Sequence, residues 1–102
     1  MSAPDSSEDL QVESDRLRAD FLRTDLELCF TFADVAEAKL KRGDHEGAEQ
    51  ALSDAKKGHE AVGRFLSDPK HAKNLTTEEL SEFTGGLERL RKRLDEVRQL
   101  TK

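Results

Sequence analysis

The sequence predicts an all-α protein: an up-down-up antiparallel bundle of three helices with a long first helix. Three observations predict this fold. Apolar residues recur at steps of three and four along three separate stretches. The composition favours helices, because Leu, Ala, Glu, Lys and Arg are abundant and the chain has only 2 prolines. Short polar links join the stretches, which forces neighbouring helices to run antiparallel. At 102 residues, we expect a disordered tail over residues 1–6 and a single domain over residues 7–102.

The first helix is predicted over about residues 8–42, a stretch without proline or glycine. Its apolar residues form two heptad seams that are out of phase, and two seams predict two partners. From residue 21 to residue 40 the apolar arc is wide enough to contact two helices at once. One seam consists of Leu10, Leu17, Phe21, Leu28 and Val35, with Ser14, Thr24 and Thr31 between them; the other consists of Leu22, Leu26, Cys29, Ala33, Ala36 and Leu40.

The second helix is predicted over about residues 45–67. Gly43 suits the left-handed residue that ends the first helix, and Asp44 suits the N-cap of the second. Small residues on one side should allow a neighbouring backbone to approach closely. The seam of this helix consists of Ala48, Leu52, Ala55, His59, Val62 and Leu66.

The third helix is predicted over about residues 77–100, after a polar connector that begins at Pro69. Thr76 and Glu79 form a capping box at its start. Gly85 and Gly86 predict either a bend or a close approach of another backbone. The seam consists of Leu80, Phe83, Leu87, Leu90, Leu94 and Val97.

The front of the first helix is the first candidate interface. The second helix is shorter than the first, so much of the stretch before residue 17 should extend beyond it. Leu10, Val12 and Leu17 would then need cover from the third helix or from another copy of the protein. We therefore expect a noncatalytic protein–protein interaction module that self-associates, with a homodimer as the expected assembly.

The basic run near the end of the chain is the second candidate interface. Arg89, Arg91, Lys92 and Arg93 could contact an acidic partner, and the first helix of a second copy is one candidate. Nucleic acid is disfavoured as a partner, since the run lacks interleaved aromatics and the chain has no Trp or Tyr. A solvated helix face is the simpler interpretation.

The hairpin over residues 32–55 resembles a single tetratricopeptide repeat. The matching positions are Phe32, Val35, Ala36, Gly43, Ala48, Leu52 and Ala55. The sequence departs from the repeat at Lys39, where an aromatic is usual, and at Glu60, where a proline is common; a second copy is not visible. The resemblance implies one hairpin within the bundle. Any tightly packed antiparallel helix pair needs small residues at these places. We therefore favour close helix packing over a true repeat as the explanation of the pattern.

A second resemblance supplies the alternative function. Arg64 and His71 loosely match the Arg and His spacing of the all-helical HEPN ribonucleases, which implies a nucleic-acid-binding or ribonuclease domain. Phe65 stands where that family has a polar residue, and Pro69 breaks the helix between the two. Chance spacing is the favoured explanation.

No other pattern indicates catalysis, a metal or a cofactor, and we expect none of these. His45 and Glu49 could offer two metal ligands, but the sequence supplies no third. His59 lies on an apolar seam, and Cys29 is predicted to be a small buried hydrophobic residue. Residues 1–40 carry ten acidic and four basic residues, which disfavours contact with nucleic acid or anionic membranes. The chain has no long apolar run and its start lacks the features of a signal peptide, so we expect a cytoplasmic protein without a membrane contact.

Overall fold

The computed structural model describes the backbone of residues 6–101 and the side chains of residues 16–101, and its fold is all-helical. The long helices are α1 (Ser6–Lys41), α2 (His45–Ser67) and α4 (Thr77–Gln99). Each lies within two residues of its predicted bounds, because local capping signals determine where helices begin and end. Ser6, expected in the tail, is the first residue of α1; the rest of that predicted tail, residues 1–5, lies outside the described residues.

The polar connector contains a fourth, short helix that the sequence analysis did not predict. This helix, α3, spans Pro69–Ala72. Pro69 stands at its first turn, where a missing backbone N–H costs nothing, and the Asp68 carboxylate accepts a hydrogen bond from the Lys70 N–H at 2.9 Å. The ring of His71 stacks on Phe65 with centroids 4.2 Å apart, which holds α3 against the end of α2.

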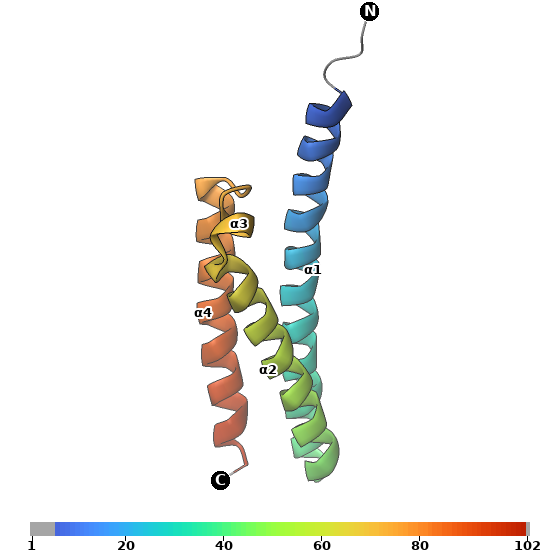
Figure 1. Cartoon of the computed structure of the whole chain (residues 1–102). Coiled ribbons are helices and arrows are strands. Elements are labelled where there is room, and N and C mark those ends of the chain that lie inside the picture. Colours follow the sequence, from blue (N-terminus) through green and yellow to red (C-terminus); the bar gives the residue numbers. More distant parts are fainter. Residues whose placement is uncertain (1–5, 102) are drawn as a thin grey trace, which may run out of the picture.

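The long helices lie side by side in an elongated molecule of 67 × 20 × 17 Å (Figure 1). α1 and α4 run in one direction and α2 runs in the other. Each of the three contacts the other two, and the contact between α1 and α2 is the most extensive. The first turns of α1 extend past the ends of α2 and α4.

The helix boundaries have the predicted local causes. Gly43 adopts φ of 80°, a left-handed conformation that costs glycine little. The Asp44 carboxylate accepts a hydrogen bond from the Gly47 N–H at 2.9 Å, and this bond lowers the pKa of Asp44. At the start of α4, Thr76 and Glu79 form the predicted capping box in both directions.

One continuous core lies between the three long helices. Its large, fully buried side chains are Phe83, Leu90, Val62 and Val97. The contribution of α1 comes from one seam only, and α2 contributes mainly alanines. The buried residues of these two helices are Ala19, Leu22, Leu26, Cys29, Ala33, Ala36, Ala48, Ala51, Leu52, Ala55 and Val62.

Two glycines allow the helices to approach closely. A Cβ added to Gly58 of α2 would overlap the Cys29 Sγ of α1. A Cβ added to Gly86 of α4 would lie 3.0 Å from Leu26 Cδ1. α4 is continuous through Gly85 and Gly86, and the close neighbour of Gly86 is the Leu26 side chain, not the other backbone that the glycine pair was expected to admit.

Arginines join α1 to α4 at two levels. Arg23 of α1 donates to Glu82 at 2.7 Å and lies 5.6 Å from the ring centroid of Phe83, and its hydrogen bond to Glu82 raises its pKa. Arg93 of α4 donates to Asp34 at 3.0 Å and to Glu37 at 3.2 Å. Arg93 thus partly neutralises the acidic side chains of α1, whereas Arg23 is a cation of α1 that an acidic residue of α4 binds.

Candidate interaction surface

An exposed apolar stripe runs along α1 on the side away from the core. Its large members are Leu17, Phe21, Leu28 and Val35, with exposed fractions of 62%, 66%, 48% and 37%. We call these four residues, together with Thr24 and Thr31 between them, the outer stripe. α1 does contact two helices, as its two seams predicted, but both α2 and α4 pack on the other seam and leave the outer stripe uncovered.

The geometry of the helix explains why one seam is left uncovered. At about 100° per residue, the outer stripe and the buried seam are centred about 150° apart around α1. Helices that pack closely on one seam cannot also reach the other. The alanines of α2 and the contact of Gly58 with Cys29 bring the axes of α1 and α2 close together. The surface of α1 that α2 covers is therefore narrow.

The polar members of the outer stripe already have hydrogen-bond partners. The Thr24 hydroxyl donates to the Asp20 carbonyl oxygen at 3.0 Å, and the Thr31 hydroxyl donates to the Glu27 carbonyl oxygen at 3.1 Å. Burying these hydroxyls against another helix would therefore leave no donor unsatisfied. The stripe is an alternating series of apolar side chains and self-satisfied threonines at steps of three and four.

The two edges of the outer stripe differ in charge. One edge, the acidic row, consists of Asp20, Glu27 and Asp34, all exposed. The other edge, the mixed row, consists of Arg18, Asp25, Phe32 and Lys39. In heptad terms these are the g and e positions beside an a/d seam, which set partner choice and orientation when two helices pair.

The predicted interface residues at the front of α1 have different outcomes. Leu17 is the second most exposed of the large apolar residues on the outer stripe. The side chains of Leu10 and Val12 lie outside the residues whose side chains the structure describes. Sequence reasoning missed Phe21, Leu28 and Val35 as interface candidates, although their shared heptad phase with Leu17 was the signal that could have identified them.

The basic run on α4 is partly used within the chain. Arg93 binds the acidic side chains of α1, and its hydrogen bond lowers the pKa of Glu37. Arg91 pairs with Glu88 at 3.5 Å and with Asp95 at 3.7 Å along its own helix. Arg89 and Lys92 are exposed and have no ion pair among the described residues. The helix thus offers two unpaired cations instead of a dense basic surface.

The structure does not bring Arg64 and His71 to one site. Arg64 lines a shallow hollow of about 580 Å³ on α2, whereas His71 lines a separate hollow beside Arg18, Lys70 and Lys73. His71 also lies 3.8 Å from an oxygen of Asp68 and stacks on Phe65. A base and an arginine that act on one phosphate must converge on it, and these two do not.

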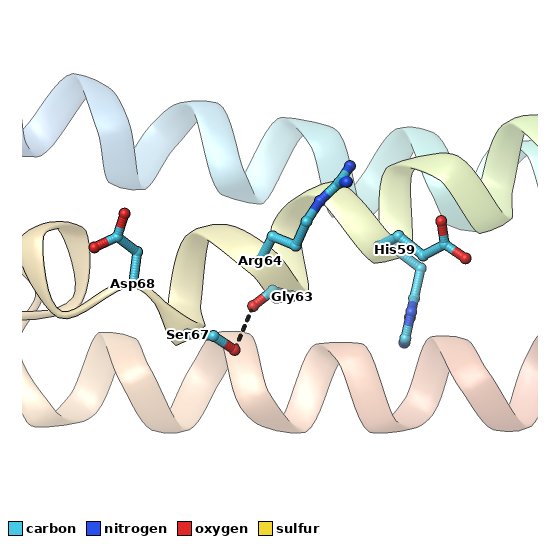
Figure 2. Close-up of a pocket in the computed structure, with 6 residues that line it drawn as sticks. His59, Gly63, Arg64, Ser67 and Asp68 are labelled. Carbon is cyan, nitrogen blue, oxygen red and sulfur yellow. Dashed lines mark hydrogen bonds between the residues drawn. The ribbon is translucent and has the colours of Figure 1, made fainter.

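The hollow on α2 does not assemble a catalytic group (Figure 2). The Ser67 hydroxyl donates to the Gly63 carbonyl oxygen at 2.9 Å, while Arg64 points to the opposite side of α2 from His59. His59 Nε2 donates to the Leu87 carbonyl oxygen of α4 at 3.2 Å, which makes it a hydrogen-bonded residue at the edge of the core. These lining residues therefore contain no nucleophile with a base in reach.

The described part of the chain also shows no geometry for a reactive cysteine, a metal site or a membrane-spanning helix. Cys29 is 2% exposed, and burial raises the pKa of its thiol, so it is a poor nucleophile. Within residues 16–101, no three His, Cys, Asp or Glu side chains gather in a way that could hold a metal ion. Among residues 6–101, none of the helices combines the length and the apolar character that crossing a bilayer requires.

Comparisons with protein-family models, with curated proteins and with solved structures find no match to this chain. The outer stripe is therefore interpreted from its own geometry alone.

Proposed function

We propose that the chain is an up-down-up three-helix bundle that acts as a noncatalytic protein–protein interaction module, and that it self-associates through the outer stripe. One observation carries the proposal: four large apolar side chains in one heptad phase are exposed along about 27 Å of a single helix, from residue 17 to residue 35. A heptad seam is the pattern by which helices pair with helices.

The area of the outer stripe supports a specific contact. The exposed fractions of its four large residues correspond to on the order of 400 Å² of apolar surface per chain. A stable dimer buries about 800 Å² per partner. The two flanking rows would add to this area, so we expect a dimer that forms in the micromolar range instead of an obligate assembly.

The charges also favour a protein partner over nucleic acid. The outer stripe has an acidic edge, which repels phosphates, and two of the four cations on the basic run are engaged by carboxylates of the same chain. The single buried thiol is compatible with a reducing compartment, and we place the protein in the cytoplasm on that basis.

Sedimentation velocity over a range of micromolar concentrations tests self-association. We expect the wild-type chain to shift from monomer to dimer, and Leu17→Ser with Phe21→Ser to remain monomeric. Leu100→Ser is the matched control: this residue is 51% exposed but lies beyond the end of α4, so the variant should dimerise as the wild type does. Circular dichroism checks that all variants keep their helices. A wild-type chain that stays monomeric throughout would overturn the proposal.

A further inference from the structure

We propose that a hollow between α1 and the short helix α3 binds a small multivalent anion that carries a phosphate group. The hollow has a volume of about 400 Å³, within the range of about 300–1,000 Å³ that small-ligand sites occupy. We call it the basic hollow, and its lining residues are Arg18, Lys70, His71, Lys73 and Asn74. The inference does not depend on self-association, since none of these residues belongs to the outer stripe.

The lining of the basic hollow is cationic in a chain whose net charge is −5. No carboxylate is among the described residues that line it. Four other hollows in the described part of the chain each include a carboxylate in their lining, for example Glu60, Glu49 or Glu82. A cation in those hollows shares the space with an opposite charge. The basic hollow instead presents three cations together, and such a lining attracts anions.

The fold brings these cations together from two parts of the chain. α1 passes at the level of α3, so that Arg18 of α1 lines the same hollow as the α3 residues (Figure 1). The backbone of Lys73, with φ of −63° and ψ of −21°, continues the turn of α3. Lys70 and Lys73 are three residues apart on that turn, so their side chains lie on one face and repel one another. A bound anion would relieve this repulsion.

The donors of the basic hollow are available to a ligand. Lys70 and Lys73 are exposed, and neither has an ion pair among the described residues. Asn74 Nδ2 donates one hydrogen to the Lys70 carbonyl oxygen at 3.5 Å and has a second hydrogen to offer. Arg18 adds a guanidinium, whose planar arrangement of N–H groups matches the oxygens of phosphate.

His71 and the neighbouring Asp68 have structural roles beside the hollow. The His71 ring stacks on Phe65, so it forms a fixed wall. The Asp68 carboxylate accepts a hydrogen bond from the Lys70 backbone N–H at 2.9 Å and does not line the hollow. This carboxylate therefore holds the turn of α3 in place and leaves the Lys70 ammonium group to the ligand.

A phosphate group suits this lining better than other anions do. A phosphate monoester carries a charge of about −1.5 to −2 at pH 7 and has three acceptor oxygens. Charged donors form the strongest hydrogen bonds to such oxygens. The cations come from one turn of α3 and one position of α1, which favours a single phosphate group over the extended backbone of a nucleic acid. The acidic row lies on the opposite edge of the outer stripe from Arg18.

Titration with inorganic phosphate tests the site. Backbone amide shifts are followed by NMR at pH 7 and constant ionic strength, and we expect saturable shifts for residues of the basic hollow. The dissociation constant for the free ion should be in the millimolar range. A peptide with one phosphoserine and the same peptide with serine identify the source of the phosphate. Tighter binding of the phosphopeptide than of inorganic phosphate indicates a phosphorylated protein, and equal or weaker binding indicates a free phosphate-bearing molecule.

Charge-matched variants separate a specific site from general attraction. Lys70→Gln with Lys73→Gln should raise the dissociation constant about tenfold. Lys57→Gln with Lys92→Gln is the matched control, since it removes the same charge from exposed positions on α2 and α4 and should leave the dissociation constant unchanged. Lys70→Arg with Lys73→Arg keeps the charge and should retain the affinity within about threefold. Circular dichroism checks that the helices of every variant are intact.

The outcomes decide whether the hollow is a phosphate site. Saturable shifts confined to the basic hollow, weakened by Lys70→Gln with Lys73→Gln but not by the control pair, support it. Shifts that do not saturate, or equal weakening by both pairs, would mean that phosphate only screens surface charge and would overturn the proposal. Equal binding of the serine peptide and the phosphoserine peptide would overturn the recognition of phosphate.

Discussion

The close contact between α1 and α2 at Gly58 can be tested by adding a single methyl group. Gly58→Ala places a Cβ where it overlaps the Cys29 Sγ, so either the thiol must rotate or the two helices must separate. Cys29 is 2% exposed and has little room to move. The substitution should therefore destabilise the protein even though alanine favours helices more than glycine does.

The magnitude follows from two opposing effects. Overlap in a packed core costs about 1–3 kcal/mol, and replacing glycine by alanine within a helix recovers up to about 1 kcal/mol. We expect Gly58→Ala to lower the free energy of unfolding by about 0–2 kcal/mol. In a Cys29→Ala background the overlap is absent, and the same methyl group should stabilise the protein by about 1 kcal/mol, so the two substitutions should couple by about 2 kcal/mol.

Urea unfolding followed by circular dichroism measures all four members of this double-mutant cycle. Gly63→Ala is the matched control, because it lies in the same helix and a Cβ there meets nothing within 4 Å. This variant should be stabilised by up to about 1 kcal/mol whether or not Cys29 is present. If Gly58→Ala changed stability equally in both backgrounds, the inferred contact between α1 and α2 would be incorrect.

Three further outcomes are expected from other parts of the fold. Thr76→Ala removes the side-chain acceptor at the start of α4 and should lower the free energy of unfolding by about 1 kcal/mol in urea titrations; no change would mean that the cap is dispensable. Phe83→Ala empties a site that is 0% exposed and should cost about 3–5 kcal/mol by the same assay, and a loss below about 1 kcal/mol would contradict the packing. Arg93 lowers the pKa of Glu37, so this pair stabilises the fold at neutral pH and the contribution is lost as pH falls below about 4.5. Arg93→Gln should raise the pKa of Glu37 in an NMR titration, and an unchanged pKa would show that the pair does not persist in solution.

The bounds of the long helices could be predicted because their causes are local. Gly43, Asp44 and the Thr76 capping box act through hydrogen bonds within a few residues, so the sequence contains all the information needed. The seams of α2 and α4 were predicted for a related reason. Each helix has a single apolar side, and the helix is stable in water only when that side is buried.

The choice between the two seams of α1 could not be predicted in the same way. Both seams have heptad spacing and similar hydrophobicity, so the sequence alone allowed both to be buried within one bundle. The separation of the two seams around the helix and the close approach at Gly58 decide that only one of them is covered. Arg93 is a second case, since its partners on α1 are 56 and 59 residues away in sequence.

The sequence by itself therefore determined the helical class, the positions of the three long helices and the core side of α2 and α4, because capping and periodicity act over one or two turns. The tertiary structure decided what lies outside that core. It leaves Leu17, Phe21, Leu28 and Val35 exposed, since a helix packed closely against two neighbours on one side turns its opposite side to solvent. The surface on which the proposed function depends is the side of α1 that packing leaves uncovered.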